Sequence, residues 1–191
     1  MALSLTPLAA LLPWRRKAPH AEKLYGAIVA QARLPIFYQQ FGVPDSLEGR
    51  FLMLSLHLFA VLHRLKDAGP DAAPMAQDLA DLFTADMETV LRELGVGDLS
   101  VPKKVRKLIA TGAGQFEDFE RALGQGEGAF AAAIAAALPD KDGIDAKAAS
   151  AQLTPYVLQM IQSLEAQSIQ TIRAGALGFP QKIDGRYPPL T

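Results

Sequence analysis

The chain contains no cysteine among its 191 residues, and this absence excludes several kinds of site. Without thiols there are no disulfide staples, no thiolate nucleophile and no cysteine-ligated metal, a composition that suits a reducing compartment. An excess of either charge is also missing, because 19 basic residues stand against 20 acidic ones. This balance excludes a general electrostatic attraction to nucleic acid, so any basic site has to be local.

Motifs of the common enzyme classes are missing as well. There is no nucleophile elbow or phosphate-binding loop, and Gly95-Val96-Gly97 lacks the third glycine and the preceding strand of a dinucleotide fingerprint. His57 and His63 are separated by roughly 240° around a helix, so they do not share a face that could bind a metal. We therefore predict no cofactor and no metal site, and no arrangement of residues nominates a catalytic group. A small-molecule enzyme on a helical scaffold is the remaining alternative.

Near the N-terminus, an apolar run ends in Trp14, Arg15, Arg16 and Lys17. Its length of about a dozen residues is short of the ~20 that span a bilayer, and a secretory signal carries its positive charge before the apolar part. We predict a flexible arm over residues 1–20. The alternative is a peripheral membrane contact through residues 1–17, in which Trp14 and the leucines enter the interface and the basic residues meet anionic lipid.

From residue 21 onward, the apolar spacing is helical and no alternating strand pattern occurs. This predicts an all-α fold, a single compact domain of about six to seven helices over residues 21–179, and an irregular tail over residues 180–191. Asp45 and Glu48 have the spacing of a capping pair, and the helix after them is apolar on nearly every side, which is typical of a central helix. Further helices are predicted over about 21–33, 73–94 and 128–138. Another begins near Pro102 and is interrupted or bent near Gly112 and Gly114, and the last long helix begins at Thr154–Pro155.

Three polar residues on the predicted central helix, Arg50, His57 and Arg64, recur every seven positions and so share one face. They form either a solvent edge with carboxylate partners or a polar groove that binds a partner protein. Arg50 is a candidate to pair with Asp45 or Asp98. An aromatic cluster precedes this helix, and it belongs either to the core or to an exposed apolar groove: Phe37, Tyr38 and Phe41.

The densest group of basic residues comprises Lys103, Lys104, Arg106 and Lys107. Three of these four share a helix face. The group is either a solvated surface or an electrostatic dock for RNA, an acidic protein or anionic lipid.

Several ordered motifs together resemble the ubiquinol–cytochrome c chaperone family, which assists assembly of the cytochrome bc1 complex. The resemblance is strongest from Leu24 to about Leu108. The matching segments are Tyr25, Gln31-Ala32-Arg33-Leu34-Pro35-Ile36-Phe37-Tyr38, Gly42-Val43-Pro44-Asp45-Ser46, Gly49-Arg50-Phe51, Leu56-His57, Asp86-Met87, Leu91-Arg92-Glu93-Leu94-Gly95-Val96-Gly97-Asp98-Leu99 and Val101-Pro102-Lys103-Lys104-Val105.

The resemblance implies a non-enzymatic, all-helical assembly factor that binds newly made cytochrome b or another bc1 subunit. Since no organellar presequence is recognisable, we expect a bacterial protein in the cytoplasm, peripheral at the inner membrane. The alternative is a ribosome- or RNA-associated module that uses the basic group at residues 103–107. The residues expected to contact the client or partner are Phe37, Tyr38, Phe41, Arg50, His57, Arg92 and Asp98.

Overall fold

The computed structural model describes residues 19–95, 97, 100–140 and 143–180. The predicted N-terminal contact segment, residues 1–17, lies outside the described residues, and so do Asp98 and the tail from residue 181. Pro19 and His20 were predicted to belong to the arm, but they form the start of the first helix.

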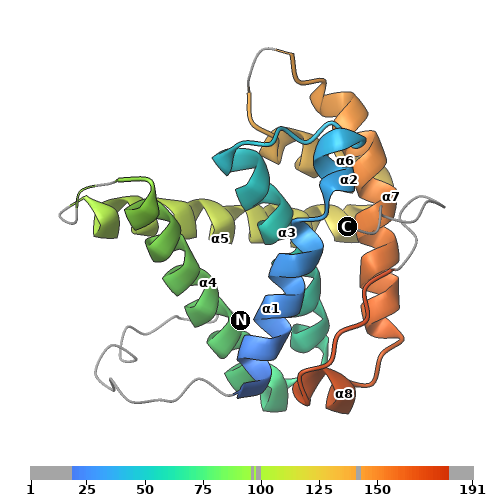
Figure 1. Cartoon of the computed structure of the whole chain (residues 1–191). Coiled ribbons are helices and arrows are strands. Elements are labelled where there is room, and N and C mark those ends of the chain that lie inside the picture. The colour runs from blue at the N-terminus through green and yellow to red at the C-terminus, as the bar shows by residue number, and fades with distance from the viewer. Residues whose placement is uncertain (1–18, 96, 98–99, 141–142, 181–191) are drawn as a thin grey trace.

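Every regular element of the described residues is a helix, which confirms the all-α prediction (Figure 1). Six helices have eleven or more residues. A five-residue helix and a 3-10 turn lie between them, and a second five-residue helix follows the last one. None of the described helices is long and apolar enough to cross a bilayer. In chain order the elements are α1 (Pro19–Ala32), α2 (Pro35–Gln39), α3 (Leu47–Asp67), η2 (Pro70–Ala72), α4 (Ala73–Glu93), α5 (Val101–Gln125), α6 (Glu127–Ala137), α7 (Ala146–Glu165) and α8 (Ile169–Arg173).

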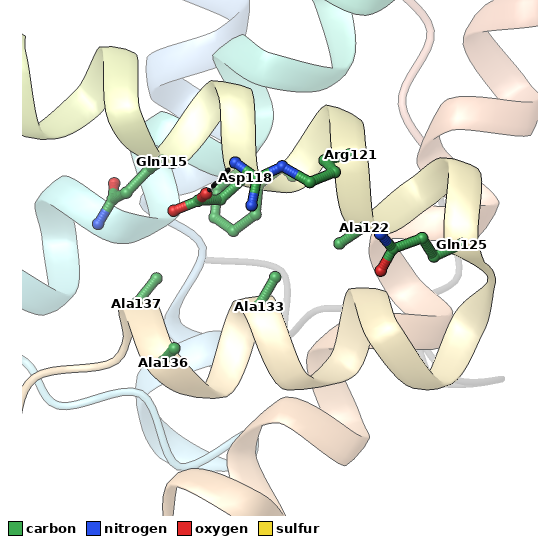
Figure 2. A pocket seen from close by; sticks show the side chains of 9 residues that line it. Gln115, Asp118, Arg121, Ala122, Gln125, Ala133, Ala136 and Ala137 are labelled. Atoms are coloured by element: carbon green, nitrogen blue, oxygen red, sulfur yellow. Dashed lines mark hydrogen bonds and ion pairs between the residues drawn. The ribbon is translucent and has the colours of Figure 1, made fainter.

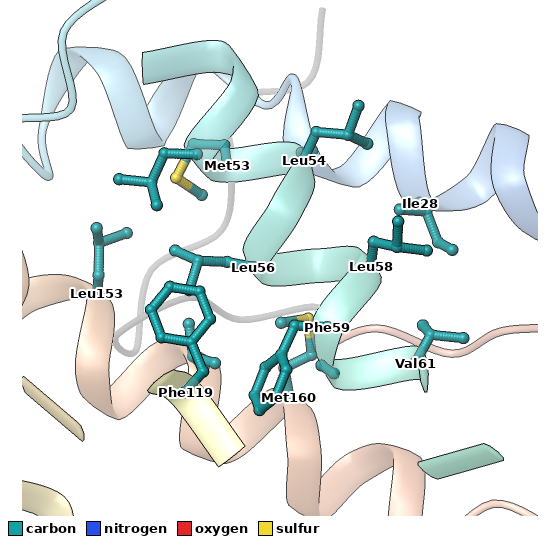
Figure 3. Close-up of a cluster of buried hydrophobic side chains, with 14 of the residues drawn as sticks. Ile28, Met53, Leu54, Leu56, Leu58, Phe59, Val61, Phe119, Leu153 and Met160 are labelled. Carbon is teal, nitrogen blue, oxygen red and sulfur yellow. The ribbon is translucent and has the colours of Figure 1, made fainter. Parts of the chain in front are cut away.

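Helix α3 is the central helix, as its all-round apolar sequence predicted. Thirteen of its 21 residues are buried, and α1, α4, α5 and α7 pack around it. Figure 3 shows Leu56 and Phe59 pointing from α3 towards Phe119 of α5 and Met160 of α7. Each fully buried side chain of this size contributes roughly 1.5–3 kcal/mol relative to exposure, so α3 is the main source of core stabilisation.

Two predicted helix boundaries are wrong. Helix α5 continues through Gly112 and Gly114, so it is not interrupted there. Gly112 is buried in this helix, and a Cβ atom there would be in ordinary van der Waals contact with the Phe51 ring, at 3.6 Å. Helix α7 begins at Ala146 and not at Thr154, because the Asp145 carboxylate accepts a hydrogen bond from the Ala148 amide and caps the earlier start.

His57, on the central helix, is completely buried and takes part in a chain of hydrogen bonds. The Met53 carbonyl can only accept, so the His57 Nδ1–H donates to it at 2.7 Å. The His57 Nε2 then accepts from the Tyr156 hydroxyl at 2.7 Å, and the Tyr156 oxygen accepts from the Gln31 amide at 3.2 Å. This chain joins α1, α7 and α3 and requires a neutral imidazole.

The buried imidazole predicts a specific dependence of stability on pH. Burial lowers the pKa of His57 from 6.5 to about 4, so between these pH values the unfolded chain binds a proton that the folded chain does not. Stability therefore falls as the pH is lowered through 6.5 and levels off below 4. We expect a loss of about 2 kcal/mol in the free energy of unfolding from roughly pH 7 to 5.

Replacing His57→Gln removes the titrating group and should abolish most of this loss. Urea denaturation of both proteins at the two pH values measures the effect. Equal losses in the wild type and the variant would contradict the assignment.

Candidate functional site

An open groove lies where α1, the start of α3 and the end of α4 meet. Its volume is about 500 Å³. The buried side chains of Phe51, Leu54 and Met87 form its floor. We call this surface the groove, and its lining residues are Val29, Ala32, Arg33, Asp45, Ser46, Leu47, Arg50, Phe51, Leu54, Asp86, Met87, Val90, Glu93 and Leu94.

Two leucines mark this groove as a binding surface. Leu47 is 39% exposed and Leu94 is 59% exposed, and they are the exposed large hydrophobic side chains of the described residues. Both line the groove. Single exposed apolar residues need no explanation, but two at the edges of one concave apolar surface are typical of an interaction site.

The start of α3 is shaped by a tight contact between Gly49 and the preceding loop. Ser46, and not Asp45 as predicted, caps the helix, because its hydroxyl accepts a hydrogen bond from the Gly49 amide at 3.3 Å. A Cβ atom on Gly49 would lie 2.0 Å from the Pro44 carbonyl oxygen. Glycine is therefore required here, and the contact holds Ser46 and Leu47 at the edge of the groove.

Asp45 instead pairs with Arg50, one of the two partners expected for that arginine. The Arg50 Nε donates to the Asp45 carboxylate at 2.6 Å, and this hydrogen bond lowers the pKa of Asp45. The two side chains are 60% and 57% exposed. Such exposed pairs contribute little to stability, so the pair remains available to a ligand.

The Asp45–Arg50 pair also borders a second cavity of about 410 Å³, which we call the side pocket. The groove and the side pocket share Arg33, Asp45 and Arg50. Tyr38 lines the side pocket, where its hydroxyl donates to the Ala32 carbonyl at 2.9 Å. Polar side chains therefore lie at one end of an apolar groove.

Tyr25 connects two walls of the groove. Its hydroxyl donates to the Asp86 carboxylate at 2.9 Å, which links α1 to α4. Burial raises the pKa of Tyr25, and the adjacent Asp86 charge raises it further, so the phenol remains protonated. The separation of these two walls is thus set by a hydrogen bond as well as by packing.

The predicted polar face of α3 does not form one groove. Arg50 is exposed, whereas His57 is buried in the core. Arg64 donates to the carbonyls of Leu164 and Gln167 at 3.0 and 3.1 Å and caps the end of α7. Seven-residue spacing placed the three on one side of α3, but different helices cover that side along its length.

Of the two alternatives for the aromatic cluster, Phe37 and Phe41 belong to the core, so they are not exposed for the client contact expected of them. They are 0% and 1% exposed, and their rings pack with Tyr156 at centroid distances of 4.9 and 6.5 Å. Tyr38 is half-buried. Arg92 is exposed near the end of α4, and Asp98 lies outside the described residues.

Sequence reasoning missed Leu47 and Leu94 as surface residues, because both continue the apolar spacing of their helices. Their location at the ends of helices is the feature that could have identified them as surface residues. Leu47 is the first residue of α3, and Leu94 follows the last residue of α4. At helix ends the next turn of a neighbouring helix is absent, so an apolar side chain can remain uncovered.

The four basic residues of the predicted cluster, Lys103, Lys104, Arg106 and Lys107, are all exposed on the first turns of α5. We call them the basic face. Within the part of the chain that the structure describes, none of them forms an ion pair. No group of three histidine, aspartate or glutamate side chains among the described residues could hold a metal ion.

A third cavity, of about 350 Å³, lies between α5 and α6 (Figure 2). Ala133, Ala136 and Ala137 line it from α6, opposite an ion pair of Asp118 and Arg121 at 2.7 Å. No exposed large hydrophobic side chain of the described residues borders it. The groove is therefore the stronger candidate for a binding site.

Comparison with known proteins gives a family match and a structural match. The family model described as ubiquinol-cytochrome C chaperone matches residues 39–179, which include the parts of the groove on α3 and α4. The crystal structure of the Cbp3 homolog from Brucella abortus is similar to this chain, with a TM-score of 0.75 and 38% sequence identity. The similarity covers 86% of this chain and 90% of that one. A comparison with curated proteins gave no match.

The contact between Gly49 and Pro44 predicts an unusual response to an alanine substitution. In a helix, alanine is normally more stable than glycine by about 1 kcal/mol. Gly49→Ala should instead destabilise the protein by about 2 kcal/mol or more, because the backbone at Pro44 has to move.

The matched control is Gly114→Ala on α5, where a Cβ atom meets nothing within 4 Å. That variant should gain up to about 1 kcal/mol. Urea denaturation measures both changes, and a stabilised Gly49→Ala protein would refute the steric argument.

Proposed function

The chain belongs to the ubiquinol-cytochrome C chaperone family, and we propose that it is a non-enzymatic assembly factor that binds newly made cytochrome b while the bc1 complex is built. The similarity to the Cbp3 homolog supports the same role. In this proposal the protein holds an apolar segment of its client until the segment packs against other subunits.

The observation that carries this proposal is the groove. Its floor is apolar, its edges expose Leu47 and Leu94, and Arg33, Asp45 and Arg50 lie at one end. An apolar helix of the client would bury these leucines, and a polar group beside that helix would meet the charged end. Grooves of this kind bind amphipathic or apolar helices through side chains spaced one turn apart.

The locations of the titratable side chains support a binding role over a catalytic one. Burial shifts the pKa values of His57, Tyr156 and Tyr25 more than those of other groups. Of these, His57 and Tyr156 lie in the core and line neither the groove nor the side pocket. Two of the charged residues at the groove form an exposed ion pair, Asp45–Arg50, and Asp86 accepts the hydrogen bond from Tyr25. Such groups orient a bound segment and do not transfer protons to it.

We place this activity in the cytoplasm of a bacterium, at the periphery of the inner membrane. The organism of the similar crystal structure supports the bacterial assignment. A ribosome- or RNA-associated role of the basic face is the alternative, since its four side chains are exposed.

Introducing charge into the groove tests the proposal. The double variant Leu47→Glu, Leu94→Glu should fold, because both side chains are already partly exposed. We expect it to lower the amount of cytochrome b that co-purifies with the tagged protein at least tenfold, since each buried carboxylate costs several kcal/mol.

The control variant Ala113→Glu, Ala132→Glu adds the same two charges at exposed positions on α5 and α6. It should recover as much cytochrome b as the wild type. Equal recovery with both double variants would place client binding outside the groove.

Deleting the gene tests the role in assembly directly. The strain should lose assembled bc1 complex, seen as reduced b- and c-type haem absorbance in membranes, while cytochrome b transcript stays normal. Unchanged bc1 levels would refute the assembly role itself, whatever the groove binds.

A further inference from the structure

The basic face lies at the projecting end of a helical hairpin. Helices α4 and α5 form this hairpin, and Figure 1 shows its end on the side of the molecule away from α7 and α8. Leu91, Val101 and Val105 form a small core there that is separate from the main one. The end is therefore a distinct, outward-pointing surface.

Charge is segregated at this end. Residues 91–110 contain five basic and two acidic residues, although the whole chain has 19 and 20. On α5, no acidic residue occurs between Val101 and Phe116. The four side chains of the basic face are exposed and form no ion pair among the described residues, so their charges are available to an anionic partner.

An apolar side chain accompanies the basic face. Leu94 is 59% exposed at the end of α4, one turn beyond Leu91, which packs against Val101 at the start of α5. Leu94 and Lys103 therefore lie at the same end of the hairpin. Basic side chains and an exposed leucine at the same end of a hairpin have the composition of a membrane-interface contact.

Nucleic acid fits this surface less well. No aromatic residue occurs between Phe83 and Phe116, so the hairpin end offers no ring on which bases could stack. Three of the four basic residues are lysines, whose point charges suit a diffuse anionic surface. Single-stranded RNA would also offer no apolar surface for the exposed Leu94 side chain.

We infer that the basic face and Leu94 form a docking site for an anionic phospholipid bilayer. The lysines and Arg106 contact lipid phosphates, and Leu94, at the same end of the hairpin, enters the interface. The site shares Leu94 with the groove, but its four basic side chains lie outside the groove lining.

Vesicle flotation with the full-length protein tests the inference. The probes are phosphatidylcholine vesicles with or without phosphatidylglycerol. The test variant is Lys103→Gln, Lys104→Gln, Arg106→Gln, Lys107→Gln, and the control variant removes four exposed charges elsewhere: Lys23→Gln, Arg121→Gln, Lys147→Gln, Arg173→Gln. Circular dichroism and melting temperature verify that both variants fold.

The wild type and the control should bind anionic vesicles similarly, and this binding should weaken with added salt. Each basic side chain near such a surface strengthens binding about fivefold, so the test variant should bind more than about a hundredfold more weakly. The three proteins should bind vesicles of phosphatidylcholine alone to the same extent.

Two results would overturn the inference. One is equal loss of vesicle binding in the test and control variants, which would show a general charge effect. The other is unchanged vesicle binding by the test variant together with loss of binding to a fluorescent single-stranded RNA, which would assign the basic face to RNA. Cytochrome b recovery does not enter either comparison, so the proposed client role stands or falls separately.

Discussion

Helix α3 carries apolar side chains on nearly every side, and burying them from water determines where the other helices pack. Its apolar side chains extend around the whole cylinder, so α1, α4, α5 and α7 each bury a different part of it. Helix α5 packs against α3 near Gly112, beside the Phe51 ring. Because covering helices of finite length cannot enclose both ends of α3 equally, its first turn stays open, and the groove lies there.

The sequence predicted the helical class, the central position of α3 and the family. These follow from the spacing of apolar residues and from motifs, which are read directly along the chain. Helix starts were harder, since Asp145 and Ser46 compete as caps with Thr154 and Asp45. The spacing of apolar residues identifies the apolar face of a helix but not which other helix, if any, packs against it. For this reason Phe37 and Phe41 could not be assigned to the core, nor Leu47 and Leu94 to the surface, before the packing was known.

The groove and the basic face divide apolar and electrostatic recognition between two surfaces that meet at the end of α4. Leu94 belongs to both surfaces, because it lines the groove and lies at the end that carries Lys103 and Lys104. The ion pair Asp45–Arg50 lies at the start of α3 and is held there by the tight loop before Gly49. Recognition elements thus occur at helix ends, while the helix middles supply stability.

The Tyr25–Asp86 hydrogen bond has a consequence for the thermodynamics of binding. It joins the two helices that form opposite walls of the groove, and the Gln31–Tyr156–His57 chain further fixes α1 against α3 and α7. The groove is therefore preorganised: its width is set before any ligand arrives. A client helix then loses its own conformational entropy on binding, but little additional entropy is lost by the protein that receives it.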